Sequence, residues 1–87
     1  MIEARDAVRL AIDAFKDITQ DTRVEHAFLE EIELVGGNGS AHWAVTISLP
    51  PRLPMLGTVM GSPDKEYKVV TIDADSGAFI SIKIRSV

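Results

Sequence analysis

The stretch His42-Trp43-Ala44-Val45-Thr46-Ile47-Ser48-Leu49 alternates large apolar side chains with small or polar ones. Successive side chains of a β-strand point to opposite faces, so this period of two predicts a strand with one buried face. Gly36-Gly37-Asn38-Gly39-Ser40 precedes the strand and Pro50-Pro51 follows it, and both segments break regular structure. This strand therefore follows a turn and ends at the two prolines, as expected of one strand in an antiparallel sheet.

A second strand is predicted on the other side of the glycine-rich turn, at about residues 28–35. Antiparallel pairing across the turn places apolar residues opposite one another, from Leu34 with Trp43 to Phe28 with Leu49. The same register sets Glu30 on the apolar face. A bulge or a bend in the first strand near Glu30 is therefore expected.

The end of the chain repeats the strand pattern around the turn segment Asp73-Ala74-Asp75-Ser76-Gly77-Ala78. Pairing Ile72 with Ile80 puts Val70 opposite Ile82 on one consistent apolar face. Residues from Glu66 onward thus predict a second hairpin. Its opposite face carries Tyr67, Val69 and Phe79, a candidate contact surface because three apolar residues there exceed what a solvated face needs.

The first twenty residues change to a helical period, with apolar residues at steps of three and four from Ala4 to Ile18 and charged residues on the other side. The order α-β-β-β-β predicts an α+β fold, one N-terminal helix packed on a four-stranded antiparallel sheet. A chain of 87 residues suffices for one such domain, residues 1–87. The expected buried core comprises Val8, Ala11, Phe15, Ile32, Trp43, Val45, Ile47, Val70, Ile72, Ile80 and Ile82.

Composition excludes several classes of function. The net charge is −4 and the nine basic residues are scattered, whereas nucleic-acid binding needs a basic stripe. The chain has no cysteine, hence no disulfide, thiol nucleophile or thiolate metal site. No apolar run approaches the roughly 20 residues that span a bilayer, and no secretory signal is visible at Met1. We therefore expect a cytoplasmic protein without nucleic-acid or membrane partners.

Candidate catalytic and metal sites are weak. Asp73 to Gly77 lacks the ligand spacing of a calcium loop, so we expect a hairpin turn in which aspartates bond backbone N–H groups and Gly77 is left-handed. His26 and His42, with Glu25 or Glu31, could approach across the first hairpin but have no metal-ligand spacing. No serine lies in a nucleophile motif. We expect no catalytic residues, no metal, no cofactor and no enzymatic activity.

The last hairpin resembles that of PepSY domains, because Ile72-Asp73-Ala74-Asp75-Ser76-Gly77 is similar to their V-D-A-x-T-G turn, with Ser76 in place of the usual threonine. The order of elements, with an alanine-rich helix first, is similar too. The resemblance implies the same fold, a role in regulating peptidases, and export from the cytoplasm. The chain departs from the family in its lack of a visible export signal and in residues 50–66.

Residues 50–66 contain prolines and glycines that oppose regular structure, and also five apolar residues. We expect either a recognition loop for a protein partner or a plug that folds back on the core. The chain is accordingly interpreted as a non-catalytic protein-binding or regulatory module, a monomer or weak homodimer, with a peptidase as the partner that the resemblance implies. The alternative is a small-ligand-binding domain or minor enzyme with a pocket between helix and sheet. The candidate loop residues are Leu53, Met55, Leu56, Val59 and Met60.

Overall fold

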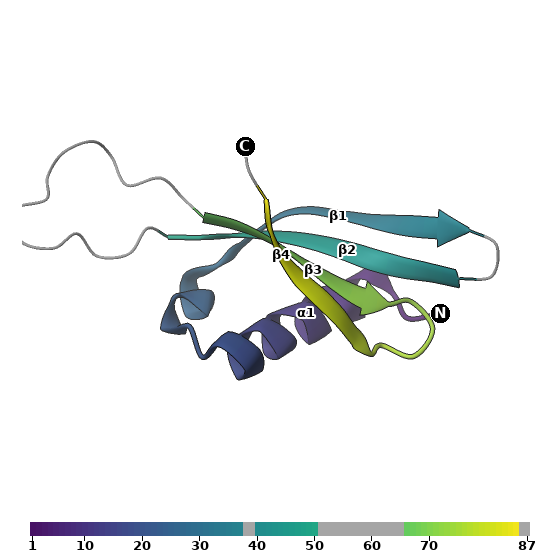
Figure 1. Cartoon of the computed structure of the whole chain (residues 1–87), viewed down its shortest axis with the longest axis horizontal. Helices are drawn as coiled ribbons and strands as arrows, with labels where there is room; N and C mark the ends of the chain where they lie inside the picture. Colours follow the sequence, from purple (N-terminus) through teal and green to yellow (C-terminus); the bar gives the residue numbers. More distant parts are fainter. Residues whose placement is uncertain (38–39, 51–65, 86–87) are drawn as a thin grey trace, which may run out of the picture.

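The computed structural model describes residues 1–37, 40–50 and 66–85. In chain order these residues form α1 (Ala4–Thr19), the short 3-10 helix η1 (Thr22–His26), β1 (Phe28–Gly37), β2 (Ser40–Leu49), β3 (Glu66–Asp73) and β4 (Phe79–Arg85). The strands form one antiparallel sheet in the order β1-β2-β3-β4, and α1 lies along one face of it (Figure 1). The predicted α+β arrangement is confirmed.

Helix α1 buries one stripe of its surface against the sheet. Ala7, Ala11 and Phe15 are at most 1% exposed, and the period of three to four residues brings them onto one face. The helix ends at Thr19, and the following residue, Gln20, still donates its N–H to the Lys16 carbonyl while its left-handed backbone (φ 54°) turns the chain out of the helix. Ile18, which was expected on the buried stripe, is 55% exposed because it lies beyond the last turn that contacts the sheet.

The β1–β2 hairpin contains the irregularity that Glu30 predicts. Leu34 lies opposite Trp43 as expected, but the register shifts between Leu29 and Glu31, leaving Glu30 as the extra residue of a bulge. The Glu30 carboxylate instead accepts a 2.6 Å hydrogen bond from Ser48 Oγ. The expected pairing of Phe28 with Leu49 is therefore wrong by one residue, because the bulge places Phe28 opposite Ser48.

The β3–β4 hairpin corrects one part of the predicted register. Val70 lies opposite Ile82 as expected, but Ile72 pairs with Phe79 rather than with Ile80. The register shifts here, and Ile80 is the extra residue of β4, 51% exposed instead of buried. Because of this second bulge, Phe79 lies on the helix side of the sheet.

Most of the predicted core is buried between α1 and the sheet. The fully buried cluster joins the helix stripe to both central strands, while Val8, Ile32, Trp43 and Ile82 are partly buried and pack against it. The predictions for these residues are confirmed, with Ile80 the exception. The buried apolar residues are Ala7, Ala11, Phe15, Val24, Val45, Ile47, Leu49, Val70 and Ile72.

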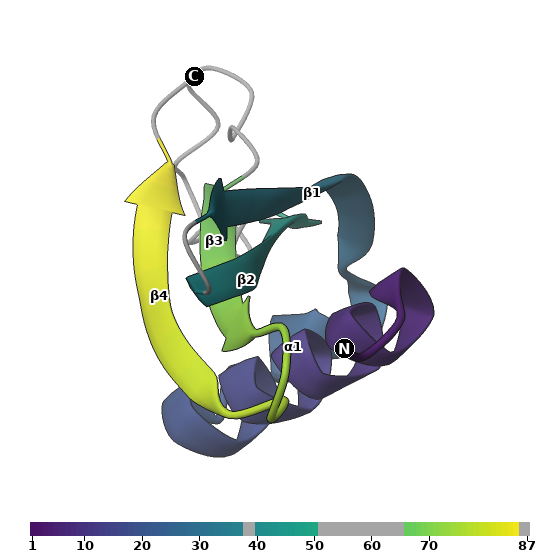
Figure 2. The same ribbon diagram turned by 90° about the vertical axis from the view of Figure 1, so that its right-hand side faces the viewer.

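The opposite face of the sheet is not covered by the helix, yet Thr46 and Ser48 of β2 are at most 3% exposed. Figure 2 shows β4 bending around the sheet, away from α1 at its C-terminal end. From this end, Arg85 reaches over β3 to bond Thr46 Oγ1 (3.2 Å) and pairs with Glu31 of β1 (2.8 Å). The two outer strands are thus linked across the helix-free face.

Candidate functional site

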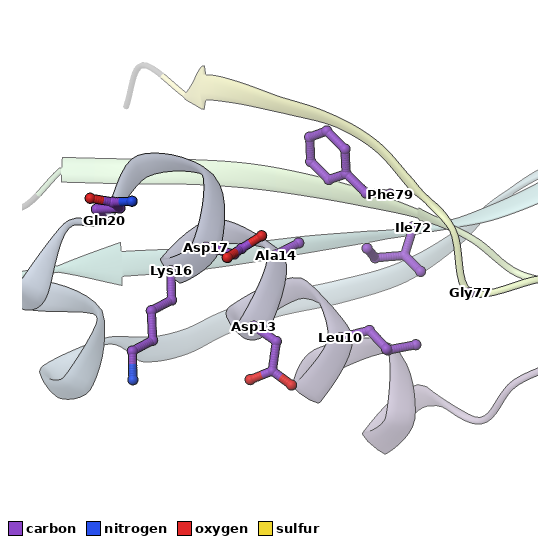
Figure 3. Close-up of a pocket in the computed structure, with 9 residues that line it drawn as sticks. All are labelled: Leu10, Asp13, Ala14, Lys16, Asp17, Gln20, Ile72, Gly77 and Phe79. Carbon is purple, nitrogen blue, oxygen red and sulfur yellow. The ribbon is translucent and has the colours of Figure 1, made fainter.

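A hollow lies between α1 and β4, and we call it the α1–β4 groove. Its volume is about 620 Å³. In Figure 3, Leu10 and Ala14 approach it from the helix, and Ile72 and Phe79 from the sheet. These four apolar side chains form its floor. The groove is also lined by Asp13, Lys16, Asp17, Gln20 and Gly77.

The β3–β4 turn fixes one end of the groove. Asp73 Oδ1 accepts hydrogen bonds from the N–H groups of Asp75 (2.8 Å) and Ser76 (3.0 Å), and these two bonds lower the pKa of Asp73. Gly77 adopts φ 78°, and a Cβ there would lie 3.1 Å from Leu10 Cδ1. The predicted hairpin turn, with aspartate bonding backbone N–H groups and left-handed Gly77, is confirmed.

A second hollow of about 430 Å³ continues past the C-terminal end of α1, and Gln20 borders both. Phe15 and Ile82 supply its apolar surface, and Lys68 of β3 also lines it. From β4, Phe79 lines the first hollow and Ile82 the second. The segment of sheet beside β4 is therefore only partly covered by α1.

Arg23 borders the second hollow and holds three elements together. Its guanidinium bonds both carboxylate oxygens of Asp21 and the Pro50 carbonyl (3.1 Å), and it contacts the Glu66 carboxylate. The hydrogen bond with Asp21 is the main cause that raises the pKa of Arg23 above its usual range. Arg23 thus links η1 to the adjacent ends of β2 and β3 through charged contacts.

The polar groups of the α1–β4 groove lie on its rim. Asp13, Lys16, Asp17 and Gln20 are all exposed, and Asp13 and Lys16 point away from the sheet in Figure 3. A small-molecule site normally directs a few polar groups into an apolar enclosure. This groove has an apolar floor and a solvated charged edge, an arrangement suited to the side chains of another polypeptide.

The three residues of the contact surface predicted on the outer sheet face do not all lie on that face. Tyr67 and Val69 lie opposite Ser48 and Thr46, on the face away from α1, and both are partly buried. Phe79 does not join them, because the β4 bulge turns it into the α1–β4 groove. The prediction that these three residues form one surface is therefore wrong for Phe79.

Another hollow, of about 450 Å³, lies on the outer face, and Val69 is one of the residues that line it. Glu31 and Glu33 border it from β1, and Lys83 and Arg85 border it from β4. The two edges of the sheet therefore present opposite charges to this face.

The five predicted loop residues, Leu53, Met55, Leu56, Val59 and Met60, lie outside the described residues.

The described residues contain no group of three or more histidine, cysteine or acidic side chains that could hold a metal. His26 precedes β1, whereas His42 pairs near its far end, so roughly the length of that strand separates them. Within residues 1–37, 40–50 and 66–85, no helix is long and apolar enough to cross a membrane.

Leu10 and Ala14 belong to the groove but were missed by the sequence interpretation. Each follows a buried alanine by three residues, Ala7 and Ala11, so both widen the apolar stripe on one flank of the helix. That spacing was available in the sequence. The side of the helix on which β4 lies was not, because it depends on the path of the chain after β3.

Comparison with known proteins gave no match among protein-family models, curated proteins or solved structures. The resemblance of the last hairpin to PepSY domains therefore stays a prediction.

Proposed function

We propose that this chain is a protein-binding module that takes an extended polypeptide segment along the edge of β4. The observation that carries the proposal is the position of this edge. In the described sheet β4 has one neighbour, β3, and its other side adjoins the apolar α1–β4 groove. An unpaired strand edge offers backbone hydrogen bonds, and an adjoining groove accepts alternate side chains.

The residues of β4 suit this mode of binding. Phe79 and Ile84 are 41% and 77% exposed, although both are large and apolar. Beyond the bulge at Ile80, the pairing of Ser81 to Arg85 with β3 is regular, so this run can continue the sheet outward. Apolar side chains of a bound strand would cover Phe79 and Ile84, which contributes roughly 25 cal/mol per Å² of apolar surface removed from water.

A small-ligand site or minor enzyme is the competing interpretation. It would need convergent polar groups inside the groove, whereas the polar lining residues are at the solvated rim. The groove therefore favours a polypeptide occupant. A peptidase is the narrower partner that the PepSY resemblance implies, and it would be one case of the same binding.

The proposal is tested by selecting peptides from a random display library on the folded protein and measuring the binding of the selected sequences. We expect Phe79→Ser to weaken binding about tenfold or more, since it removes an apolar contact of the groove. Ile18→Ser is the matched control, because Ile18 is also large, apolar and 55% exposed but lines neither of the two hollows beside β4. It should leave binding unchanged.

Backbone amide shifts in NMR spectra supply the second measurement. Bound peptides should shift the signals of β4 and of the α1 flank carrying Leu10 and Ala14. A library that yields no sequence-dependent binder would contradict the proposal. So would shifts confined to β1 or to the outer face.

A further inference from the structure

The two edge strands of the sheet have complementary patterns. On the outer face, β1 presents Glu31 and Glu33, whereas β4 presents Lys83 and Arg85. On the helix side, both strands present apolar residues instead. Among the described residues, Glu31 and Arg85 form an ion pair, whereas Glu33 and Lys83 have no ion-pair partner.

From this complementarity we propose that the segment bound by β4 is strand β1 of a second copy of this chain. The proposal rests on the proposed function, and it names the partner of the same edge. The copies would associate head to tail, β4 of one against β1 of the next, so that the sheet continues from molecule to molecule.

Strand direction permits this pairing. Neighbouring strands in the sheet are antiparallel, so β1 and β3 run one way while β2 and β4 run the other. A second copy placed beside β4 in the same orientation therefore offers its β1 antiparallel to β4. Its helix then lies on the same side of the continued sheet as the first helix.

The register follows from charge. Placing Lys83 opposite Glu33 of the second copy also places Arg85 opposite Glu31 of that copy, because both pairs lie two residues apart along antiparallel strands. Each opposed pair of unlike charges contributes modestly to strand pairing. In this register Lys83 and Glu33 gain each other as partners, while Arg85 and Glu31, already paired within one copy, are not opposed by a like charge.

The same register aligns the apolar residues on the helix side. Ile84 falls opposite Ile32 of the second copy, and Ile82 falls opposite its Leu34. Ile84 is 77% exposed and Leu34 is 46% exposed in the single chain, and the pairing would cover both. The bulges at Glu30 and Ile80 lie outside the aligned runs 31–35 and 81–85, both of which are regular.

Symmetric pairing of like edges is disfavoured. Two β4 strands paired antiparallel about Ile84 would place Lys83 of each copy opposite Arg85 of the other. Two β1 strands paired about Ile32 would oppose Glu31 and Glu33 in the same way. Like charges directly opposite destabilise a strand pair. Of these three arrangements, the head-to-tail one alone places unlike charges opposite each other.

The test is the molar mass in sedimentation from micromolar to millimolar protein, with charge-reversed variants. Lys83→Glu opposes two acids at the contact, and Glu33→Lys opposes two bases. Each variant alone should associate about five- to tenfold more weakly than the wild type. Mixed in equal amounts, the two variants restore unlike charges at every contact and should recover the wild-type mass. Both changes leave the Glu31 and Arg85 side chains in place.

Recovery on mixing requires folded protein, so a variant that merely unfolds cannot imitate it. Val69→Lys is the control, because self-association through the outer face would be abolished by it, whereas edge pairing would remain. A wild type that stays monomeric at millimolar concentration overturns the inference, as does mixing that restores nothing. Peptide binding by a monomeric wild type would then leave the proposed function standing with a foreign partner.

Discussion

Arg23 and Glu66 join η1 to the first residue of β3, although 43 positions separate them in the sequence. The same guanidinium bonds Asp21 and the Pro50 carbonyl, so one side chain connects three parts of the chain at one end of the sheet. Arg23 is only 13% exposed. Planar guanidinium geometry suits this bidentate contact and lysine cannot reproduce it.

We expect Arg23→Ala to lower the free energy of unfolding by about 2–3 kcal/mol, because it leaves partly buried carboxylates without their cation. Arg5→Ala is the control, since Arg5 is 86% exposed and pairs only loosely with Glu3 at 3.9 Å. Its effect should stay below about 0.5 kcal/mol. Denaturant titration of both variants checks this. Equal losses would show that the Arg23 contacts contribute no more than a surface pair.

Phe15 anchors α1 to the sheet and is 1% exposed. Phe15→Ala should cost about 3–5 kcal/mol, through lost apolar burial and the cavity left behind. Ile18 lies three residues further along the same helix but is 55% exposed. Ile18→Ala should therefore be nearly neutral, and alanine's helix propensity favours it slightly. If urea titration gave similar losses for the two variants, the helix would not be docked through Phe15.

Gly77 is required at the β3–β4 turn for two reasons. Its φ of 78° is unfavourable for residues with a Cβ, and a Cβ would press against Leu10 at 3.1 Å. We expect Gly77→Ala to cost about 1–2 kcal/mol. The double variant with Leu10→Ala removes the close contact and should show a smaller additional loss from the glycine change. Strict additivity of the two losses would show that the contact contributes nothing.

The fold could be predicted from the sequence because its signals are local periods. The alternation from Trp43 to Leu49 and the helical stripe through Phe15 each specify an element and its buried face. Glu30 was informative as an exception, because a carboxylate on an apolar face needs either a partner or a bulge. The structure supplies both: Glu30 is the extra residue of the β1 bulge, and its carboxylate accepts a hydrogen bond from Ser48.

The candidate site was harder to predict because it depends on a single inserted residue. An extra residue at Ile80 reverses which side of β4 every earlier residue faces, and so moves Phe79 from the outer face to the groove. Ile80 and Phe79 are both large and apolar, so their periodicity fits either register. Only the hydrogen bonds of the turn, including Asp73 N–H to the Ala78 carbonyl at 2.8 Å, decide between the two.

Asp73 gives the hairpin turn a dependence on pH. The N–H groups of Ser76 and Asp75 bond its carboxylate and lower its pKa in the folded protein, whereas in the unfolded chain it titrates near its ordinary pKa of about 3.8. A group with a lowered folded pKa stabilises the fold above its unfolded pKa, and that contribution is lost as the pH falls through the folded pKa. Asp73→Ala should therefore destabilise the protein near neutral pH.

The difference between Asp73→Ala and the wild type should shrink as the pH falls from about 4 through the lowered pKa of the folded protein, because the Asp73 carboxylate of the unfolded chain takes up its proton first. Urea titrations of both proteins across this range measure the difference directly. Asp75→Ala is the matched control, since in the turn Asp75 donates its backbone N–H to Asp73 and keeps that bond when its side chain is removed. A difference between Asp73→Ala and wild type that stays constant down to low pH would contradict the assignment of the charge-dependent bonds to Asp73.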